Sequence, residues 1–258
     1  MGDIVVIKCG GSVLDELSES FFDSLQELKN KGKSIVIVHG GGPEIGKLLK
    51  QLNVPSEFVH GLRKTTKEVL EVAEMILAGK VNKQLVSLLQ KNGLKAIGLS
   101  GIDAGLLEAK PVNVNQLGYV GEVVDVNVSF LEQLLASDYI PVIAPIGFDK
   151  HGQKYNINAD TAAGAVAQAL EAKHLLFVTD VPGILQNGKV VEQTTVTSIL
   201  EMINDGTIYG GMIPKVKAAI ESIAGPLQEV IIVSGKTSFY SASGEISGTK
   251  IMKEAGVC

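Results

Sequence analysis

Six short runs of apolar residues, rich in valine and isoleucine, recur along this 258-residue chain. The runs cover residues 4–7, 35–38, 96–99, 140–146, 175–178 and 230–233. Several are continuous rather than alternating, which is typical of strands buried on both faces of a parallel sheet. Segments with a helical apolar period lie between them. The pattern therefore predicts an α/β fold, a three-layer αβα sandwich around a mainly parallel open sheet.

Capping patterns predict where the helices start and end. In three places a Ser or Thr is followed three residues later by Glu, which is the pattern of a capping box at a helix N-terminus. The pairs are Thr65 with Glu68, Ser129 with Glu132, and Ser198 with Glu201. Gly32 and Gly206 are expected to end helices, and Pro43 is expected in the first turn of another. The alanine-rich residues 161–170 predict a closely packed helix.

Two segments depart from the alternation of strands and helices. Residues 112–128 alternate polar and apolar side chains around two glycines, and residues 189–191 follow an Asn-Gly pair. Both patterns predict β-hairpins. The alternation restarts near residues 171–173, which predicts a boundary between an N-terminal lobe, 1–172, and a C-terminal lobe, 173–258.

Charge and cysteine content exclude several classes of partner. The net charge is −5 and there is no basic run or tryptophan, so binding to nucleic acid or to an anionic membrane is not expected. The apolar run at residues 4–7 is too short for a signal peptide or a membrane span. Cys9 and Cys258 form no disulfide framework. We therefore expect a cytoplasmic protein.

The first two apolar runs each end in glycines. Lys8-Cys9-Gly10-Gly11-Ser12 follows the first run, and His39-Gly40-Gly41-Gly42-Pro43 follows the second. Such turns at strand ends present backbone N–H groups to anions, and a neighbouring lysine adds a charge for phosphate. Taken alone, Lys8 is equally consistent with a strand-end lysine that reaches solvent. His39 is consistent with a packing residue.

Three later turns also carry candidate functional groups. Asn156-Ile157-Asn158-Ala159-Asp160 precedes the alanine-rich helix, and by itself Asp160 is best explained as a helix N-cap. Residues 179–184 form a strand-end turn of the kind found at nucleotide sites, although any β-turn with proline would look the same. Gly210-Gly211-Met212-Ile213-Pro214-Lys215 places a lysine at a helix start. The helix dipole disfavours a cation there unless an anion binds between them.

Two nucleotide-binding motifs are nearly matched but fail. Gly41 to Gly46-Lys47 has the Walker A spacing, but Leu48 occupies the position of the Mg²⁺-binding Ser or Thr. The dinucleotide fingerprint fails because Ile45 occupies the position of its last glycine. Both failures argue against a P-loop NTPase and a nicotinamide-dependent dehydrogenase.

Taken together and in this order, the five turns resemble the amino-acid kinase family over essentially the whole chain. The resemblance implies the amino-acid kinase fold, with acceptor binding and dimerisation in lobe 1–172 and ATP binding in lobe 173–258. It implies catalytic roles for Lys8 and Lys215, which stabilise the transferred phosphoryl group, and for Asp160, which holds both lysines. The segment Gly61-Leu62-Arg63-Lys64-Thr65-Thr66 resembles that of family members that phosphorylate N-acetyl-L-glutamate.

The resemblance also implies the binding residues. The acceptor site would comprise Gly41, Gly42, Arg63 and Asn156. The nucleotide site would comprise Gly10, Gly11, Asp180, Val181, Pro182, Gly183, Ile184, Leu185, Thr207, Ile208, Tyr209, Gly210, Gly211 and Met212. ATP would carry Mg²⁺ on its phosphates, and no protein ligand for the metal is predicted.

The implied reaction is ATP-dependent phosphorylation of the side-chain carboxylate of N-acetyl-L-glutamate, a step of arginine biosynthesis. Two alternatives stay open: a family kinase for aminoadipate, glutamate or aspartate, and an amino-acid or nucleotide sensor without catalysis. Arginine-sensitive relatives carry an additional N-terminal helix, whereas the first strand here starts almost at Met1. The resemblance therefore implies an arginine-insensitive homodimer.

Overall fold

The computed structural model describes the chain apart from residues 1, 12, 224–226, 228, 242–243 and 254–258. Ser12 and Cys258, which belong to the sequence patterns above, lie outside the described residues. Within the described ranges, no helix combines the length and the apolar character that crossing a membrane requires.

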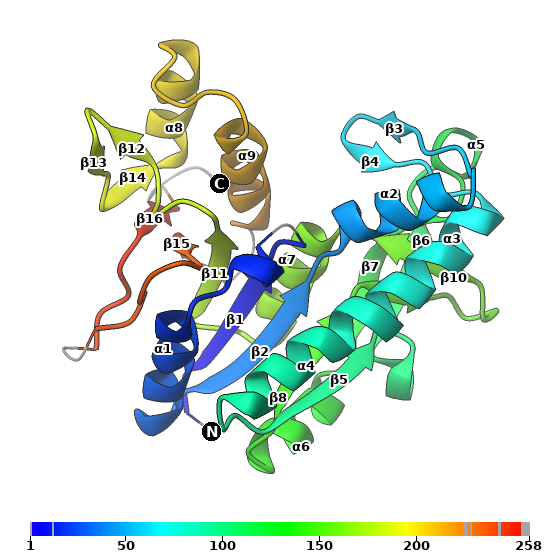
Figure 1. Cartoon of the computed structure of the whole chain (residues 1–258), viewed down its shortest axis with the longest axis horizontal. Helices are drawn as coiled ribbons and strands as arrows, with labels where there is room; N and C mark the ends of the chain where they lie inside the picture. The colour runs from blue at the N-terminus through cyan, green and yellow to red at the C-terminus, as the bar shows by residue number, and fades with distance from the viewer. Residues whose placement is uncertain (1, 12, 224–226, 228, 242–243, 254–258) are drawn as a thin grey trace.

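An eight-stranded sheet forms the centre of the described part of the molecule (Figure 1). Its strand order is β14-β16-β15-β11-β1-β2-β8-β5, and each neighbouring pair is parallel except β15 with β16. The strands are β1 Ile4–Cys9, β2 Ser34–His39, β5 Ala96–Ser100, β8 Ile140–Ala144, β11 His174–Thr179, β14 Gln193–Thr195, β15 Glu229–Ser234 and β16 Thr249–Met252. The predicted mainly parallel open sheet is confirmed.

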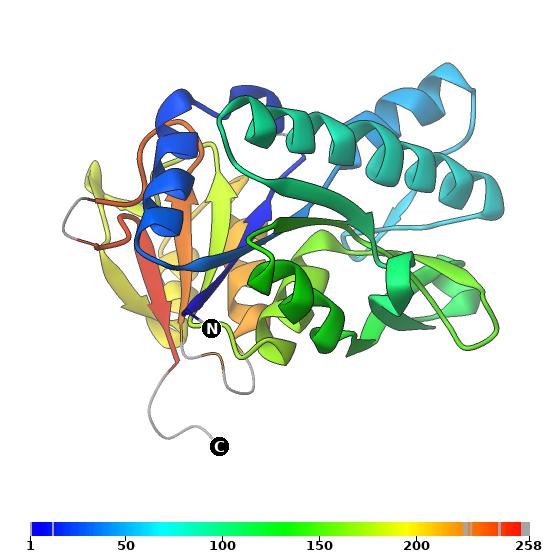
Figure 2. The ribbon, with the colours of Figure 1, turned by 90° about the horizontal axis from the view of Figure 1, so that it is seen from below.

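Helices cover both faces of this sheet, as Figure 2 shows. On one face lie α1 Glu19–Asn30, α2 Gly42–Gln51, α3 Lys67–Glu74, the π-helix η2 Met75–Val81 and α4 Asn82–Lys91. On the other lie α6 Val128–Ala136, α7 Ala159–Ala169, α8 Val196–Asn204 and α9 Met212–Ser222. Alternate residues of β1 explain the two layers, because Val5 packs into one core and Val6 into the other. Short 3₁₀ turns are η1 Leu14–Glu16 and η3 Asp103–Gly105.

A small four-stranded sheet closes on itself beside the central one. It comprises β6 Leu107–Pro111, β7 Val120–Val126, β9 Ile146–Phe148 and β10 Lys154–Ile157. The apolar run 140–146 is therefore not one strand, because it divides at Pro145 between the two sheets. The hairpin predicted at 112–128 starts earlier, since β6 is its first strand and the short helix α5 Val114–Leu117 connects it to β7.

The hairpin predicted around residues 189–191 is confirmed as β12 Leu185–Gln186 with β13 Lys189–Val190. A further hairpin, β3 Phe58–Val59 with β4 Leu62–Arg63, follows α2. The central sheet runs without a break across the predicted lobe boundary, because β1 pairs with β2 on one side and with β11 on the other.

The three predicted capping boxes are wrong, because a different residue caps each helix. The side chains that cap α3, α6 and α8 are Thr66, Asn127 and Thr195, which accept from Val69, Phe130 and Ser198 N–H respectively. Each helix therefore starts one to three residues from the predicted position.

Candidate functional site

The glycine turns after β1 and β2 lie in contact at the carboxyl edge of the central sheet. The Gly40 N–H donates to the Cys9 carbonyl at 2.9 Å. A Cβ added at Gly11 would lie 2.7 Å from the Gly41 nitrogen and Cα, a distance that real Cβ atoms do not reach. Glycine is therefore needed at Gly11 for the two backbones to approach each other.

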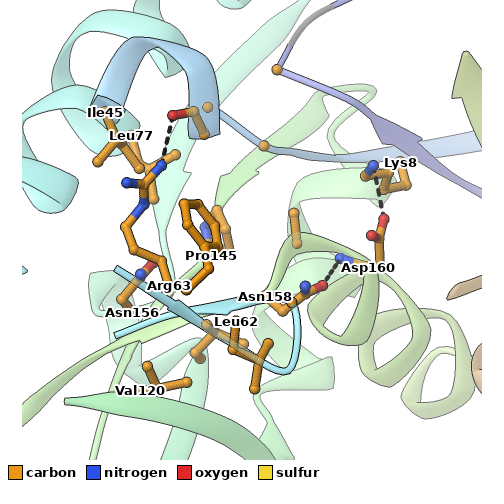
Figure 3. A pocket seen from close by; sticks show the side chains of 18 residues that line it. Lys8, Ile45, Leu62, Arg63, Leu77, Val120, Pro145, Asn156, Asn158 and Asp160 are labelled. Atoms are coloured by element: carbon orange, nitrogen blue, oxygen red, sulfur yellow. Dashed lines mark hydrogen bonds and ion pairs between the residues drawn. The ribbon is translucent and has the colours of Figure 1, made fainter. Parts of the chain in front are cut away.

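A pocket of about 230 Å³ opens beside these turns (Figure 3). Seven residues predicted for the site line it: Lys8, Gly11, Gly41, Gly42, Arg63, Asn156 and Asp160. The labelled side chains show that Arg63 and Asn156 lie at one end of the pocket, and Lys8 and Asp160 at the other. The pocket thus has a cationic group near each end. Its apolar wall, which the sequence did not reveal, includes Ile45, Leu62, Leu77, Val120 and Pro145.

Lys8 and Asp160 form an ion pair between the end of β1 and the first turn of α7. The Lys8 Nζ and the Asp160 Oδ1 are 2.8 Å apart, and the two side chains are only 16% and 26% exposed. The interpretation of Asp160 as the N-cap is wrong, because the Asn158 Oδ1 accepts from the N–H groups of Asp160 and Thr161. The carboxylate of Asp160 is therefore left to pair with the lysine.

Arg63, at the end of β4, is held in place by several contacts. Its Nη2 donates to the Gly42 carbonyl at 2.9 Å, and its Nη1 donates to the Ser56 hydroxyl. Its guanidinium carbon lies 4.6 Å from the centre of the Phe58 ring. Partial burial lowers the pKa of Arg63 from its usual range, but a guanidinium stays protonated in proteins. The arrangement offers a fixed cation with donors for a carboxylate.

Lys215 does not line this pocket but lies near Lys8 beside a neighbouring one. A second pocket, of about 130 Å³, is lined by both lysines, Gly10, Asp160 and Thr179 among others. Lys215 donates to Asp180, and this lysine lowers the pKa of that aspartate. Asp160 was expected to hold both lysines, but in the structure Lys215 pairs with Asp180 instead. The space between the lysines is where a phosphate group would meet two positive charges.

The side chains within the two predicted nucleotide segments differ in accessibility. Ile184 and Ile208 are 1% and 2% exposed, so their side chains belong to the core. The Ile184 N–H donates to the Thr249 hydroxyl at 2.8 Å, which fixes the turn after β11. Tyr209, in contrast, is 76% exposed. These segments can therefore contact a nucleotide through main chain and through exposed side chains, and not through the two isoleucines.

A buried network behind the glycine turn was missed by sequence reasoning. His39 is fully buried, and its Nδ1 lies 2.9 Å from the Gly40 carbonyl. A carbonyl only accepts, so Nδ1 donates and Nε2 accepts from the Asn82 amide at 3.1 Å. Burial lowers the pKa of His39 to about 4. The available signal was that Asn82 lies three residues before Leu85 and seven before Leu89, on the apolar face of the helical pattern.

Known proteins resemble this chain in sequence and in fold. The model of the amino acid kinase family matches residues 3–234. The chain is 68% identical over 257 residues to an acetylglutamate kinase from Geobacillus sp. (strain WCH70), a match that covers 100% of both chains. The solved structure of smu.665 from Streptococcus mutans UA159 is 35% identical, with a TM-score of 0.84 and coverage of 98% and 99%. Carbamate kinase from Giardia lamblia, 18% identical with a TM-score of 0.67 and the same coverage, shares the fold.

Proposed function

Because this chain belongs to the amino acid kinase family, we propose that it transfers the γ-phosphoryl group of ATP to the side-chain carboxylate of N-acetyl-L-glutamate, a step of arginine biosynthesis. The observation that carries the proposal is the pocket with Arg63 at one end and Lys8 at the other. An elongated acceptor with a carboxylate at each end fits such a pocket. One carboxylate is held, and the other reacts.

The acceptor is oriented by charge at one end and by apolar surface along its side. The Arg63 guanidinium binds the α-carboxylate, and Asn156 supplies amide groups beside it. Leu62 and Val120 line the same pocket and provide an apolar surface for the acetyl methyl group. Free glutamate carries an ammonium group at that position, which an apolar wall does not solvate. The acetyl group is therefore the basis of acceptor selectivity.

The reaction needs positive charge rather than a base. A side-chain carboxylate is ionised at pH 7, so no proton has to be removed before it attacks the γ-phosphorus. In-line transfer places developing negative charge on the phosphoryl oxygens. Lys8 and Lys215 stabilise that charge, with N–H groups of Gly10 and Gly11. Asp160 holds Lys8, and phosphate oxygens compete with Asp180 for Lys215.

The transfer site does not resemble a metal centre formed by protein ligands. Among the described residues no three His, Cys, Asp or Glu side chains are grouped so as to hold a metal, and Asp160 is already paired with Lys8. As the family resemblance implies, we assign Mg²⁺ to the phosphates of ATP and name no protein ligand for it. The metal supplies charge neutralisation on those phosphates.

The proposal extends to domain organisation and assembly. Acceptor binding and dimerisation belong to lobe 1–172, and ATP binding to lobe 173–258, where residues 180–185 and 207–212 surround the nucleotide. The active form is an arginine-insensitive homodimer in the cytoplasm. Light scattering that gives a hexamer, or inhibition by micromolar arginine, would contradict this part of the proposal.

An acceptor panel tests the function directly. Acyl phosphate is trapped as a hydroxamate with N-acetyl-L-glutamate, glutamate, aspartate and aminoadipate as acceptors. We expect turnover with N-acetyl-L-glutamate and none with the acceptors that carry a free amino group. Turnover of one of these instead identifies a different kinase of the family. Nucleotide binding without any turnover identifies a sensor.

A further inference from the structure

Thr65 lies behind the acceptor pocket, between β4 and α3. Thr65 is 0% exposed and does not line the pocket. Buried hydroxyl groups are retained where they are hydrogen-bonded, and the partners of this one are the two residues at the arginine end of the pocket. A buried threonine with such partners can control how they are oriented.

The hydroxyl group of Thr65 connects these two residues. The Thr65 Oγ1 donates to the Arg63 carbonyl at 2.8 Å and accepts from the Asn156 Nδ2 at 3.2 Å. A hydroxyl has one hydrogen, and the carbonyl can only accept, so both directions are fixed. The amide of Asn156 therefore turns its nitrogen towards Thr65. Its Oδ1 and its second N–H are left for a molecule in the pocket.

Main-chain pairing prevents the hydroxyl from moving. The Thr65 N–H donates to the Leu117 carbonyl at 2.9 Å, and the Thr65 carbonyl accepts from the Tyr119 N–H at 2.8 Å. The Tyr119 carbonyl in turn accepts from the Asn156 N–H at 2.9 Å. Residues 117–119, between the end of α5 and the start of β7, thus pair with Thr65 and, through the Tyr119 carbonyl, with the main chain of Asn156. The separation of Arg63 and Asn156 is set through this one register.

Gly118 makes that close pairing possible. It has a φ of +66°, and a Cβ there would lie 2.3 Å from the Thr65 carbonyl oxygen. Both the conformation and the space therefore require glycine. The pairing keeps the Thr65 hydroxyl in line with Arg63 on one side and Asn156 on the other.

We propose that Thr65 is a positioning residue for the acceptor: its hydroxyl fixes the backbone of Arg63 and the amide orientation of Asn156, so that both contact one acceptor molecule together. The inference rests on the proposed function and adds a determinant of acceptor affinity that makes no contact with the acceptor. Thr65 therefore affects the acceptor site and not the ATP site, which is formed by other elements.

The test compares Thr65→Val with Thr65→Ser. Valine keeps the shape and loses both hydrogen bonds, whereas serine keeps the hydroxyl. We expect Thr65→Val to raise the KM for N-acetyl-L-glutamate about tenfold or more, the size of one or two lost hydrogen bonds. The KM for ATP should stay within about twofold in both variants, and Thr65→Ser should stay within about threefold of wild type for the acceptor.

Equal acceptor KM values for the valine variant and the wild type would overturn the inference, as would equal losses in the valine and serine variants or parallel rises for ATP. If Thr65→Val does not fold, Thr65→Ala against Thr65→Ser gives the same comparison. The wild type is assayed first on the acceptor panel. If it turns over a different acceptor, the proposed function fails, and the Thr65 comparison is then made with that acceptor.

Discussion

The ionisation of His39 is linked to the stability of the fold, because the ring is fully buried between Gly40 and Asn82. Nδ1 donates to a carbonyl and Nε2 accepts from an amide, so the neutral ring satisfies both partners. A second proton would place an N–H against the N–H of Asn82. Burial favours the neutral form most strongly, the positive charge of Lys83 adds to it, and the hydrogen bond to Gly40 opposes it, so that the pKa of His39 is lowered from 6.5 to about 4.

The sign and size of the effect follow from these two pKa values. Between pH 6.5 and pH 4 the unfolded chain binds more protons at this site than the folded one, so stability falls as the pH falls. A difference of about 2.5 between the pKa values corresponds to about 3 kcal/mol in total, which is fully lost only below pH 4. Between pH 7 and pH 5 the loss from His39 alone is about 2 kcal/mol.

Urea unfolding of the wild type and of His39→Gln, at pH 7 and at pH 5, isolates this contribution. Glutamine does not titrate and can accept from Asn82. The carboxylates and the other histidines therefore contribute equally to the pH dependence of the unfolding free energy in both proteins. We expect the wild type to lose about 2 kcal/mol more than the variant between the two pH values. Equal losses in the two proteins would refute the linkage, and with it the assigned neutral form of His39.

Three further variants probe the candidate site. Lys8→Ala should lower kcat by about 10² to 10³, the effect of removing one group that stabilises transition-state charge, with an unchanged circular dichroism spectrum. Arg63→Lys should raise the KM for the acceptor about tenfold in steady-state assays and leave the KM for ATP unchanged, because an ammonium cannot bind a carboxylate in bidentate fashion. Gly11→Ala should destabilise the fold by about 1 to 3 kcal/mol in urea unfolding, because its Cβ would meet the Gly41 backbone.

The strands and the glycine turns could be predicted because their signals are local. In β2, Ile35 and Ile37 face one core while Val36 and Val38 face the other, so this unbroken apolar run is a strand buried on both faces. Parallel strands place their carboxyl ends at one edge. For this reason the turns after β1 and β2 could be expected together before their contact was seen.

The helix starts could not be predicted as well, because several residues within a few positions of each other offered the same capping chemistry. Thr65 and Thr66 are both threonines, and the capping-box spacing selects the first. Thr66 is the cap because Thr65 is held in a bridge with Gly118, a pairing with a residue far along the chain. Tertiary structure, which the local pattern does not contain, decided between them. The pairing of Lys215 with Asp180 was missed for the same reason.

The residues before α7 show how the capping question bears on function. Asn158 satisfies the N–H groups of Asp160 and Thr161, so the start of the helix does not depend on the carboxylate. Asp160 is in the first turn, where the helix dipole stabilises negative charge, and its Oδ1 contacts the Lys8 Nζ. Because Asn158 caps the helix, the helix fixes the position of Asp160, and the carboxylate of Asp160 is available to pair with Lys8. An aspartate that both capped the helix and held the lysine would have to give up one contact whenever the lysine moved towards a phosphate.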